Sequence, residues 1–512
     1  MLYLLKVPRE VKHACFNSKR DDFVTETFQL PPTPLEEFTL DNGLRVVLSQ
    51  DHSIPVVSVA VYYDVGSRNE KEGRTGFAHL FEHMMFQGSE NVPKAAHFQY
   101  IFNAGGTMNG TTSTERTNYF ETLPSNYLPL AFWLESDRMR SLKVTQENLD
   151  NQRNAVQEEK RLRYDNQPYV NAFLRMNELI FTNAANAHST IGSMEDLDAA
   201  TIDDVREFFR IYYAPNNAVM TVVGDFDKTV ARTLIEQYFG TIPAQPDPPP
   251  VDVSETDEVA IREEVFEDPL APAPAIVLGW KIPARRTKEF YALSLGGTLL
   301  FDGDSSRLYQ QLVKGDESVV SIEGGIDERR GPSAFYIFAL PKPDQEASKI
   351  RERIFEEIKR LADAGPSEEE MEKLQNSLCN DAVRGRQSTM YRAQRLAEFA
   401  LYDSQARLFD QELQHYLSVN ADDIKAAIKR YVDVENRVSL DIVPAQAQAT
   451  ESAASASPQG PGDEHQPAAP APQIPDKPSP EVDSSKIKEL PEIKPTAHPE
   501  QPRDPADVPH QP

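Results

Sequence analysis

A proline-rich break divides this chain, and the order of predicted elements begins again after it. Residues 243–250 read Pro-Ala-Gln-Pro-Asp-Pro-Pro-Pro, which is typical of a linker. The apolar strand predicted at 275–280 resembles the one at 56–61, at an offset of about 220 residues. A repeat of this length predicts two similar domains and not a solenoid of short repeats. The second copy has no histidines at the positions of His79 and His83, so we expect it to be degenerate.

Each copy mixes short alternating strands with amphipathic helices, which predicts an α+β fold. Asn42-Gly43 is a strong turn signal between the two strands of a hairpin at 38–48. We expect two duplicated domains, each a mainly antiparallel sheet with helices packed on it. The predicted divisions are a lead-in (1–32), a first domain (33–242), a Pro-rich linker (243–254), a degenerate second domain (255–443) and a tail (444–512).

The predicted tail differs from the rest of the chain in composition. Of the 39 prolines, 16 lie between Pro444 and Pro512, and this stretch has no aromatic residue. Such a segment cannot bury enough apolar surface to offset the entropy lost on ordering, which predicts disorder. It is either a tether or interaction segment, or an inert extension.

Composition narrows the classes of function. The 512 residues carry a net charge of −27, which argues against nucleic-acid binding and suits basic peptides, cationic partners or plain solubility. Two cysteines make neither a disulfide framework nor a Cys-rich metal site. No apolar run approaches the length that crosses a bilayer. The apolar start is too short for a secretory signal, so we expect either a cytoplasmic protein or, if the true start carries a signal, a periplasmic one.

His79, Glu82 and His83 lie on one face of a helix predicted in an apolar stretch. The histidines are at i and i+4, and Glu82 stands at the edge of their face. Buried imidazoles need a partner, and a zinc ion suits two of them at this spacing. His-x-x-Glu-His is also the inverted form of the zinc-peptidase signature His-Glu-x-x-His. The alternative is a chance match of five residues.

A catalytic zinc site needs a third protein ligand. The helix predicted from Gln146 towards Arg163 offers two adjacent carboxylates, Glu158 and Glu159. From the residues alone, either carboxylate could complete the site.

Over residues 38–443 the chain resembles the pitrilysin or insulinase-type inverted zincins. This family includes insulin-degrading enzyme, the mitochondrial processing peptidases and bacterial zinc peptidases. The resemblance rests on the His-x-x-Glu-His motif, the Asn-Gly hairpin, the duplication and the segment Asn-Ala-Val-Gln-Glu-Glu at 154–159. In the family a glutamate some 75 residues beyond the second histidine completes the metal site. Glu159 has 75 residues between it and His83.

The resemblance implies that 33–242 is a catalytic peptidase domain with one zinc ion per chain. His79, His83 and Glu159 would hold the metal, and Glu82 would take a proton from water and pass it to the leaving amine. Glu158 would be a solvated or second-shell carboxylate. Manganese or cobalt could use the same ligands, because affinity alone does not select the metal.

The resemblance also implies that the substrate adds as a strand beside Asn109, Gly110 and Thr111. Recognition of the peptide backbone by an edge strand fits an endopeptidase with broad sequence tolerance. The alternative for Asn109 is turn chemistry alone.

The chain departs from the family in two places. Seven residues before the glutamate ligand the family has a second-shell Glu, where this chain has Gln152, so the hydrogen bonding around the metal is changed. Active members also carry an Arg and a Tyr, four residues apart, in the second half. Asp316 and Val320 stand in those places, while Arg307, Arg329 and Arg330 have the wrong spacing.

In this family the zinc site and the Arg/Tyr pair can belong to two different chains. We therefore expect a metalloendopeptidase that is the catalytic subunit of a heterodimer, with a homologous partner that supplies the pair. A homodimer that works without the pair is the weaker alternative. The alternative from another class is a non-catalytic scaffold or peptide-holding subunit that retains the fold.

Overall fold

Strands from the two halves of the chain form two separate sheets. A computed structural model describes residues 28–445 apart from 257–260, so the start of the predicted lead-in and nearly all of the predicted tail lie outside the described residues. The first sheet has the order β1-β2-β6-β3-β5-β4 and the second has β7-β11-β8-β10-β9. The first comprises β1 (Glu36–Thr39), β2 (Arg45–Gln50), β3 (Val56–Tyr63), β4 (Thr107–Thr112), β5 (Thr117–Pro124) and β6 (Ala218–Gly224). The second comprises β7 (Arg262–Asp268), β8 (Ala275–Ile282), β9 (Val319–Asp327), β10 (Ser333–Pro341) and β11 (Val438–Pro444).

The two sheets repeat one connectivity, as the duplication predicted. β2 runs parallel to β6 and β7 runs parallel to β11, while the remaining neighbours among the equivalent strands are antiparallel. β8 therefore occupies the place of β3, in agreement with the resemblance between their sequences. β1 is an addition to the first sheet. It pairs with β2 through the predicted hairpin, in which Thr39 lies opposite Arg45 and Gly43 has a φ of 89°. The α+β fold with two sheets is confirmed.

Helices cover the first sheet on both faces. On one face, alternate residues of β3 (Val57, Val59, Val61 and Tyr63) pack with helices of the first half. These and their neighbours are α2 (Phe77–Met84), α3 (Ala96–Asn103), α4 (Leu128–Ser141), α5 (Gln146–Lys160), α7 (Ala184–Ala187), α8 (Met194–Asp198), α9 (Ile202–Tyr212) and α10 (Lys228–Phe239). Because both faces are covered, β3 is buried along almost its whole length.

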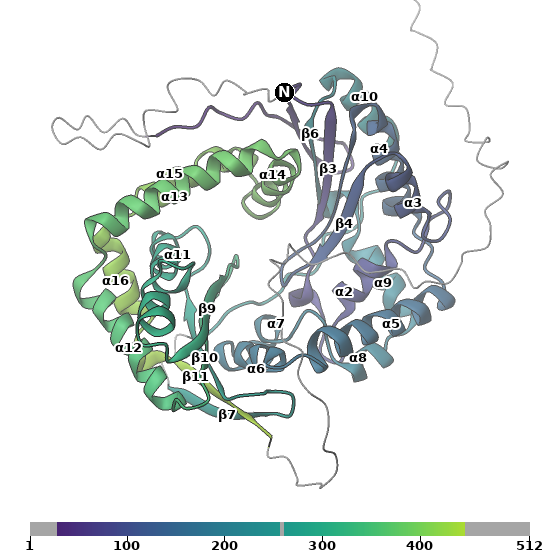
Figure 1. Cartoon of the computed structure of the whole chain (residues 1–512). Helices are drawn as coiled ribbons and strands as arrows, with labels where there is room; N and C mark the ends of the chain where they lie inside the picture. Colours follow the sequence, from purple (N-terminus) through teal and green to yellow (C-terminus); the bar gives the residue numbers. More distant parts are fainter. Residues whose placement is uncertain (1–27, 257–260, 446–512) are drawn as a thin grey trace, which may run out of the picture. The chain divides into compact units, whose positions relative to one another are not determined.

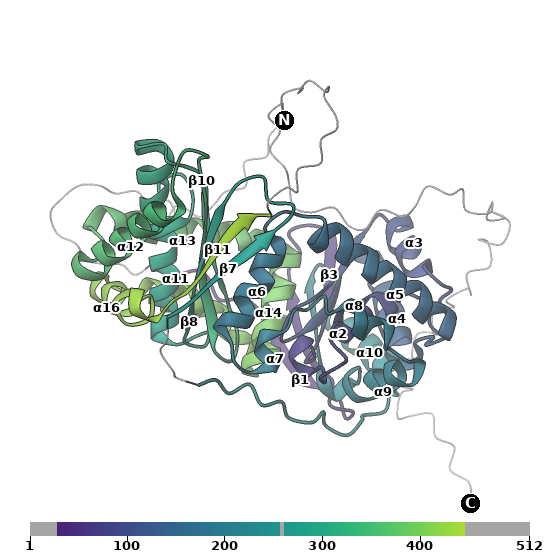
Figure 2. The ribbon, with the colours of Figure 1, turned by 90° about the horizontal axis from the view of Figure 1, so that it is seen from below.

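Each sheet is also covered by a helix from the other half of the chain. α14 (Thr389–Asp403) packs on the second face of the first sheet, against Val47, Ala60 and Tyr62 among others. In the opposite direction, α6 (Val170–Ile180) packs on the second sheet, against β8 and β11. Figures 1 and 2 show α14 beside the first sheet and α6 beside the second. The other helices of the second half are α11 (Lys288–Phe301), α12 (Ala347–Ala364), α13 (Glu368–Gln387), α15 (Glu412–Leu417) and α16 (Ala421–Tyr431).

Ion pairs join the two halves next to this exchange of helices. Arg330, in the loop between β9 and β10, donates from Nη2 to Oδ1 of Asp64 at 2.6 Å. Arg392 of α14 donates to Oδ2 of Asp51, also at 2.6 Å. The two halves thus form one compact unit. Among the described residues, no helix is both long and apolar enough to span a membrane.

Candidate metal centre

The helix α2 carries both histidines of the His-x-x-Glu-His motif. It begins at Phe77 after Gly76, which has a φ of 84°, and its apolar side is buried in the first core. His79 and His83 lie one turn apart on the opposite edge, with ring centroids 4.8 Å apart. The apolar spacing thus fixes the helix against the core and leaves the two imidazoles on one side.

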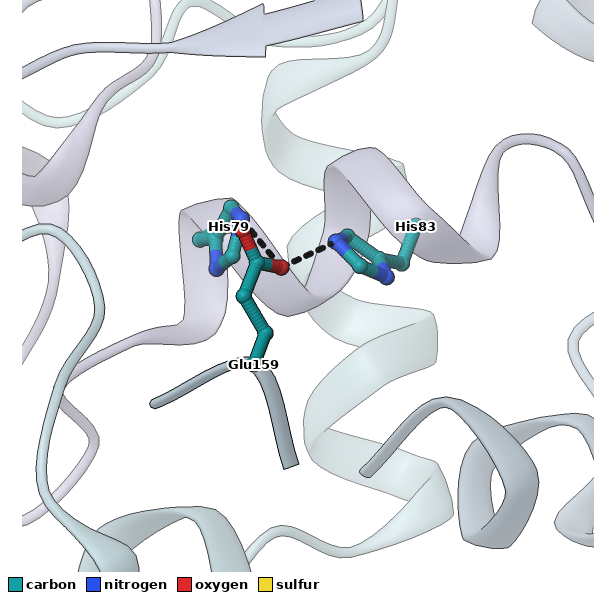
Figure 3. Close-up of side chains that lie close together, drawn as sticks. All are labelled: His79, His83 and Glu159. Carbon is teal, nitrogen blue, oxygen red and sulfur yellow. Dashed lines mark ion pairs between the residues drawn. The ribbon is translucent and has the colours of Figure 1, made fainter. Parts of the chain in front are cut away.

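Glu159 comes from the last turn of α5 and points at both imidazoles (Figure 3). Its Oε2 lies 3.6 Å from Nε2 of His79 and 3.3 Å from Nε2 of His83. α5 packs directly on α2, which brings together residues far apart in the sequence. The structure therefore brings together the three residues that the sequence singled out as metal ligands.

The distances between the three side chains suit ligands of one zinc ion better than they suit hydrogen bonds among the side chains. A separation of 3.6 Å is long for a hydrogen bond, whereas tetrahedral ligands bonded at 2.0–2.1 Å stand about 3.3 Å apart. Burial, and then the neighbouring His83, lower the pKa of His79 to about 4, so its ring is neutral at neutral pH. Burial raises the pKa of Glu159, but contacts with His83, His79 and Arg163 outweigh this and leave the pKa lowered. A neutral imidazole and an ionised carboxylate are both ligands that zinc binds.

Glu82 lies beside this cluster and contacts the edge strand β4. Thr112 donates from Oγ1 to Oε2 of Glu82 at 2.6 Å. A Cβ placed on Gly110 would lie 3.3 Å from both Cγ and Oε1 of Glu82, so the strand can approach this closely because Gly110 has no side chain. Burial raises the pKa of Glu82, and the hydrogen bond from Thr112 offsets part of this. A carboxylate with a raised pKa takes up a proton more readily near neutral pH.

Within the described part of the chain, β4 is the edge strand of the first sheet and pairs with β5 alone. Of the three residues predicted to contact substrate, Gly110 faces Glu82. Asn109 is exposed, and Thr111 donates to Oδ1 of Asn118 on β5. The outer edge of β4 beside Glu82 is where an added peptide strand would pair.

The remaining predicted positions differ in burial and in contacts. Gln152 is half-buried on α5, two turns before Glu159. Glu158 is exposed and pairs with Arg161 at 3.2 Å. In the second half, Asp316 forms an ion pair with Arg353, and Val320 is exposed on β9.

The arginines near Asp316 and Val320 are held by other carboxylates. Arg307 pairs with Glu370, Arg329 with Asp327, and Arg330 with Asp64. Each of these guanidinium groups is therefore committed to a contact within the chain.

Four residues of this region have contacts that the sequence analysis did not anticipate. Thr112 could have been found, because it shares a strand face with Gly110 at i and i+2. Arg163 could also have been found, since it lies four residues after Glu159, with whose Oε1 it forms an ion pair at 3.1 Å. Glu70 and His188 carry no local signal, because their contact joins residues 118 positions apart.

A second cluster, His97, Glu121 and Glu135, lies entirely within the first core. Arg138 bonds both oxygens of Glu135, and its guanidinium lies over the ring of Tyr119 at 4.2 Å. Burial and the adjacent Glu135 raise the pKa of Glu121, which favours its neutral form. A neutral Glu121 leaves one carboxylate and one guanidinium, which balance each other, so this cluster is a buried ion pair with its own counter-charge.

Two family models match the chain. The model described as insulinase (peptidase family M16) matches residues 45–191, which contain His79, His83 and Glu159. The model described as the peptidase M16 inactive domain matches residues 199–378. The duplication thus corresponds to two different family segments, of which the second carries the description "inactive".

Curated relatives match the chain over different extents. It is 28% identical over 401 residues to the zinc protease PqqE of Helicobacter pylori, covering 77% of this chain and 90% of that protein. It is 26% identical over 226 residues to the mitochondrial-processing peptidase subunit beta of Lentinula edodes, covering 44% of this chain and 48% of that one.

A solved structure also matches. The crystal structure of a protease from Helicobacter pylori has a TM-score of 0.78 and 25% sequence identity, covering 81% of this chain and 100% of that one. Two family models, relatives named as zinc proteases, and a shared fold all agree. The chain therefore belongs to the insulinase-type M16 family of peptidases.

Proposed function

We propose that this protein is a zinc metalloendopeptidase that hydrolyses peptide bonds of unfolded peptides. The observation that carries the proposal is the convergence of His79, His83 and Glu159, with both Nε2–Oε2 separations close to the edge of a zinc tetrahedron. Glu82 shares the helix α2 with the two histidines and contacts the edge strand β4.

These residues divide the work of peptide hydrolysis. His79, His83 and Glu159 would hold one zinc ion, which supplies a Lewis acid for the scissile carbonyl and acidifies a water molecule. Glu82 accepts the proton of that water and donates it to the leaving amine. Thr112 holds Glu82 in place from β4 at 2.6 Å.

Substrate binding would use the outer edge of β4. A peptide paired there passes Gly110, which lies directly against Glu82. Main-chain pairing reads no particular side chain, so broad sequence tolerance follows.

We further propose that this chain is the catalytic subunit of a heterodimer. Asp316 and Val320 stand where active relatives have an Arg and a Tyr, and Arg307, Arg329 and Arg330 are each held by a carboxylate of this chain. A homologous partner that carries the Arg/Tyr pair would complete the site. The lack of an Arg and a Tyr at positions 316 and 320 also favours the second candidate function, a non-catalytic subunit that holds peptides.

The test is hydrolysis of a quenched fluorescent peptide, with zinc content measured on the same sample. Wild type, Glu82→Gln and the control Glu158→Gln are each assayed alone and mixed with a homologous chain that carries the Arg/Tyr pair. We expect Glu82→Gln to keep its zinc and to lose activity by about 10²–10⁴-fold, and Glu158→Gln to match wild type.

Three outcomes separate the candidates. Cleavage only in mixtures that contain a chain with Glu82 supports a catalytic subunit. Cleavage by wild type alone contradicts the heterodimer and keeps the peptidase. Bound zinc without cleavage in any mixture supports the peptide-holding subunit.

A further inference from the structure

The N-terminus of α2 is held by a buried carboxylate from outside the helix. The N-cap residue of α2 is Gly76, which has no side chain to accept hydrogen bonds from the free N–H groups of the first turn. Glu70 takes that place: Oε2 accepts from the Gly76 N–H at 2.9 Å, and Oε1 accepts from the Ala78 N–H at 2.7 Å. The side chain of Glu70 is fully buried. His79 is the next residue along, so Glu70 fixes the end of α2 that carries the first proposed metal ligand.

Glu70 is in turn held by His188, which follows α7. Nε2 of His188 lies 2.9 Å from Oε2 of Glu70, and Nδ1 lies 2.6 Å from the carbonyl oxygen of Ala184. The segment after His188 packs on the start of α2. A Cβ on Gly192 would come within 2.5 Å of the Cα of Gly76, and the Ser193 N–H donates to Oγ1 of Thr75 at 3.1 Å.

The hydrogen-bond partners of His188 determine how many protons the His188–Glu70 pair holds. Both ring nitrogens face an acceptor oxygen, whereas a neutral imidazole has one N–H. One proton must therefore lie between Nδ1 and Ala184, and a second between Nε2 and Glu70. Removal of either proton would leave two lone pairs facing each other at hydrogen-bond distance.

We propose that His188 is a positioning residue for the metal centre, which acts through Glu70 and holds the start of α2 in place while both of its ring nitrogens are protonated. The inference rests on the proposed function in one respect, namely that α2 carries the metal ligands. Alkaline loss of a proton from the pair loosens the contact between the segment 184–193 and α2, and zinc is then released faster.

The charges around the ring agree with this assignment. Burial lowers the pKa of His188, but the hydrogen bond to Glu70 and its charge outweigh this, so that the pKa is raised. His188 lines a cavity of ≈ 530 Å³ together with Tyr164 from the first half and with residues of the second sheet and its loop, including Tyr336. The charged ones among these are Glu323, Asp327 and Arg329, of which Asp327 and Arg329 pair with each other.

The sign of the pH effect follows from the raised pKa. The stabilising contact is complete below the ordinary histidine value of about 6.5. It is lost as the pH rises through the higher pKa of the folded protein. We therefore expect a limit to zinc retention on the alkaline side.

The first measurement is a ¹⁵N NMR titration of the full zinc-loaded chain with labelled histidine rings. The signals of His188 are identified by their loss in His188→Gln. We expect both ring nitrogens to stay protonated above pH 6.5. His52, which is exposed and pairs with Asp225 at 2.6 Å, serves as the comparison ring. Titration of His188 at or below pH 6.5 would overturn the inference.

The second measurement is the rate at which a chelator removes zinc, as a function of pH. In wild type we expect the rate to rise through the pKa of His188. In His188→Gln we expect a rate about 10-fold higher with no such step, and in His188→Lys a slow rate without the alkaline step. His52→Gln should behave as wild type. A wild-type pH profile in His188→Gln would contradict the positioning role.

These readouts separate the inference from the proposed function. The protonation of His188 and the release of zinc are measured without any peptide substrate. Bound zinc without cleavage would leave the role of His188 intact while removing the peptidase assignment. If His188→Gln does not fold, the titration of wild type, assigned with His188→Lys, still decides the matter.

Discussion

Arg163 controls which oxygen of Glu159 is free to face a metal. It occupies Oε1 at 3.1 Å, while Oε2 faces both histidines. Partners that orient a ligand are worth about 10–100-fold in metal affinity, so Arg163→Gln should weaken zinc binding by about 10-fold. Competition with a chelator measures this. Arg161→Gln is the matched control, because Arg161 pairs at 3.2 Å with the neighbouring Glu158. Equal zinc affinity in the two variants would rule out the orienting role.

The proposed ligands could be predicted from the sequence, whereas their supports could not. His79 and His83 share a helix face, and the family spacing selects Glu159 over its neighbour Glu158. The contact of His188 with Glu70 depends instead on how the segment 184–193 packs, because nothing within a few residues of either side chain requires it. Local periodicity carries no information about such a distant partner.

β4 and α2 approach each other at Gly110, and this contact is sensitive to one methyl group. A Cβ at Gly110 would lie 3.3 Å from Cγ of Glu82 and 3.1 Å from Cδ1 of Tyr119, which is tighter than ordinary contact. Gly110→Ala should therefore displace Glu82 and lower kcat by about 10- to 100-fold, with zinc content unchanged. Gly331→Ala is the control, since its Cβ would meet Val253 at 3.5 Å. A wild-type kcat in Gly110→Ala would mean that Glu82 does not depend on this approach.

Long elements could be predicted more fully than short ones. Lys228–Phe239 and the helix ending at Ala364 have clear apolar periodicity, and Thr201 is a typical cap residue at the start of α9. The helix predicted from Gln146 towards Arg163 instead changes at Arg161 into a five-residue π turn, Arg161–Asp165. Its wider backbone ring shows in the hydrogen bond from the Asn166 N–H to the Arg161 carbonyl, and Lys160 pairs with Asp165 across it. One turn is too short for its side-chain pattern to distinguish it from an α-helix.

The duplication predicted two sheets but not the exchange of α6 and α14 between them. The buried side of α14 includes Ala393, Leu396, Ala397 and Phe399. This apolar pattern predicts that the helix is packed, but it does not predict which of the two sheets the helix packs on. Polar contacts fix the choice: Thr221 of β6 donates to the Ala393 carbonyl at 2.8 Å, and Ser58 of β3 bonds Thr389 at 2.8 Å. These pairings join residues 172 and 331 positions apart, so no local pattern reveals them.

Because each sheet is completed by a helix of the other half, the two halves should unfold together. Phe399 of α14 is fully buried against the first sheet, and Phe399→Ala should lower the free energy of unfolding by about 3–5 kcal/mol. Phe102→Ala, at a side chain that is 52% exposed, should change it by about 0.5 kcal/mol or less. The chain has two tryptophans, Trp133 on α4 and Trp280 on β8, so each half has its own fluorescent reporter.

Denaturant titrations of Trp133→Phe and Trp280→Phe, each with and without Phe399→Ala, would follow the two halves separately. Phe399→Ala removes packing from the first sheet, yet α14 belongs to the second half of the chain. Loss of the Phe399 ring should therefore shift the unfolding transitions seen by Trp133 and by Trp280 to lower denaturant concentration by the same amount. A shift confined to Trp133 would show that the first sheet unfolds alone, and that the exchanged helices do not couple the halves. Equal shifts would mean that β4, the strand beside Glu82, does not unfold unless the second sheet unfolds as well. The proposed site would then depend for its order on the half of the chain that supplies none of its metal ligands.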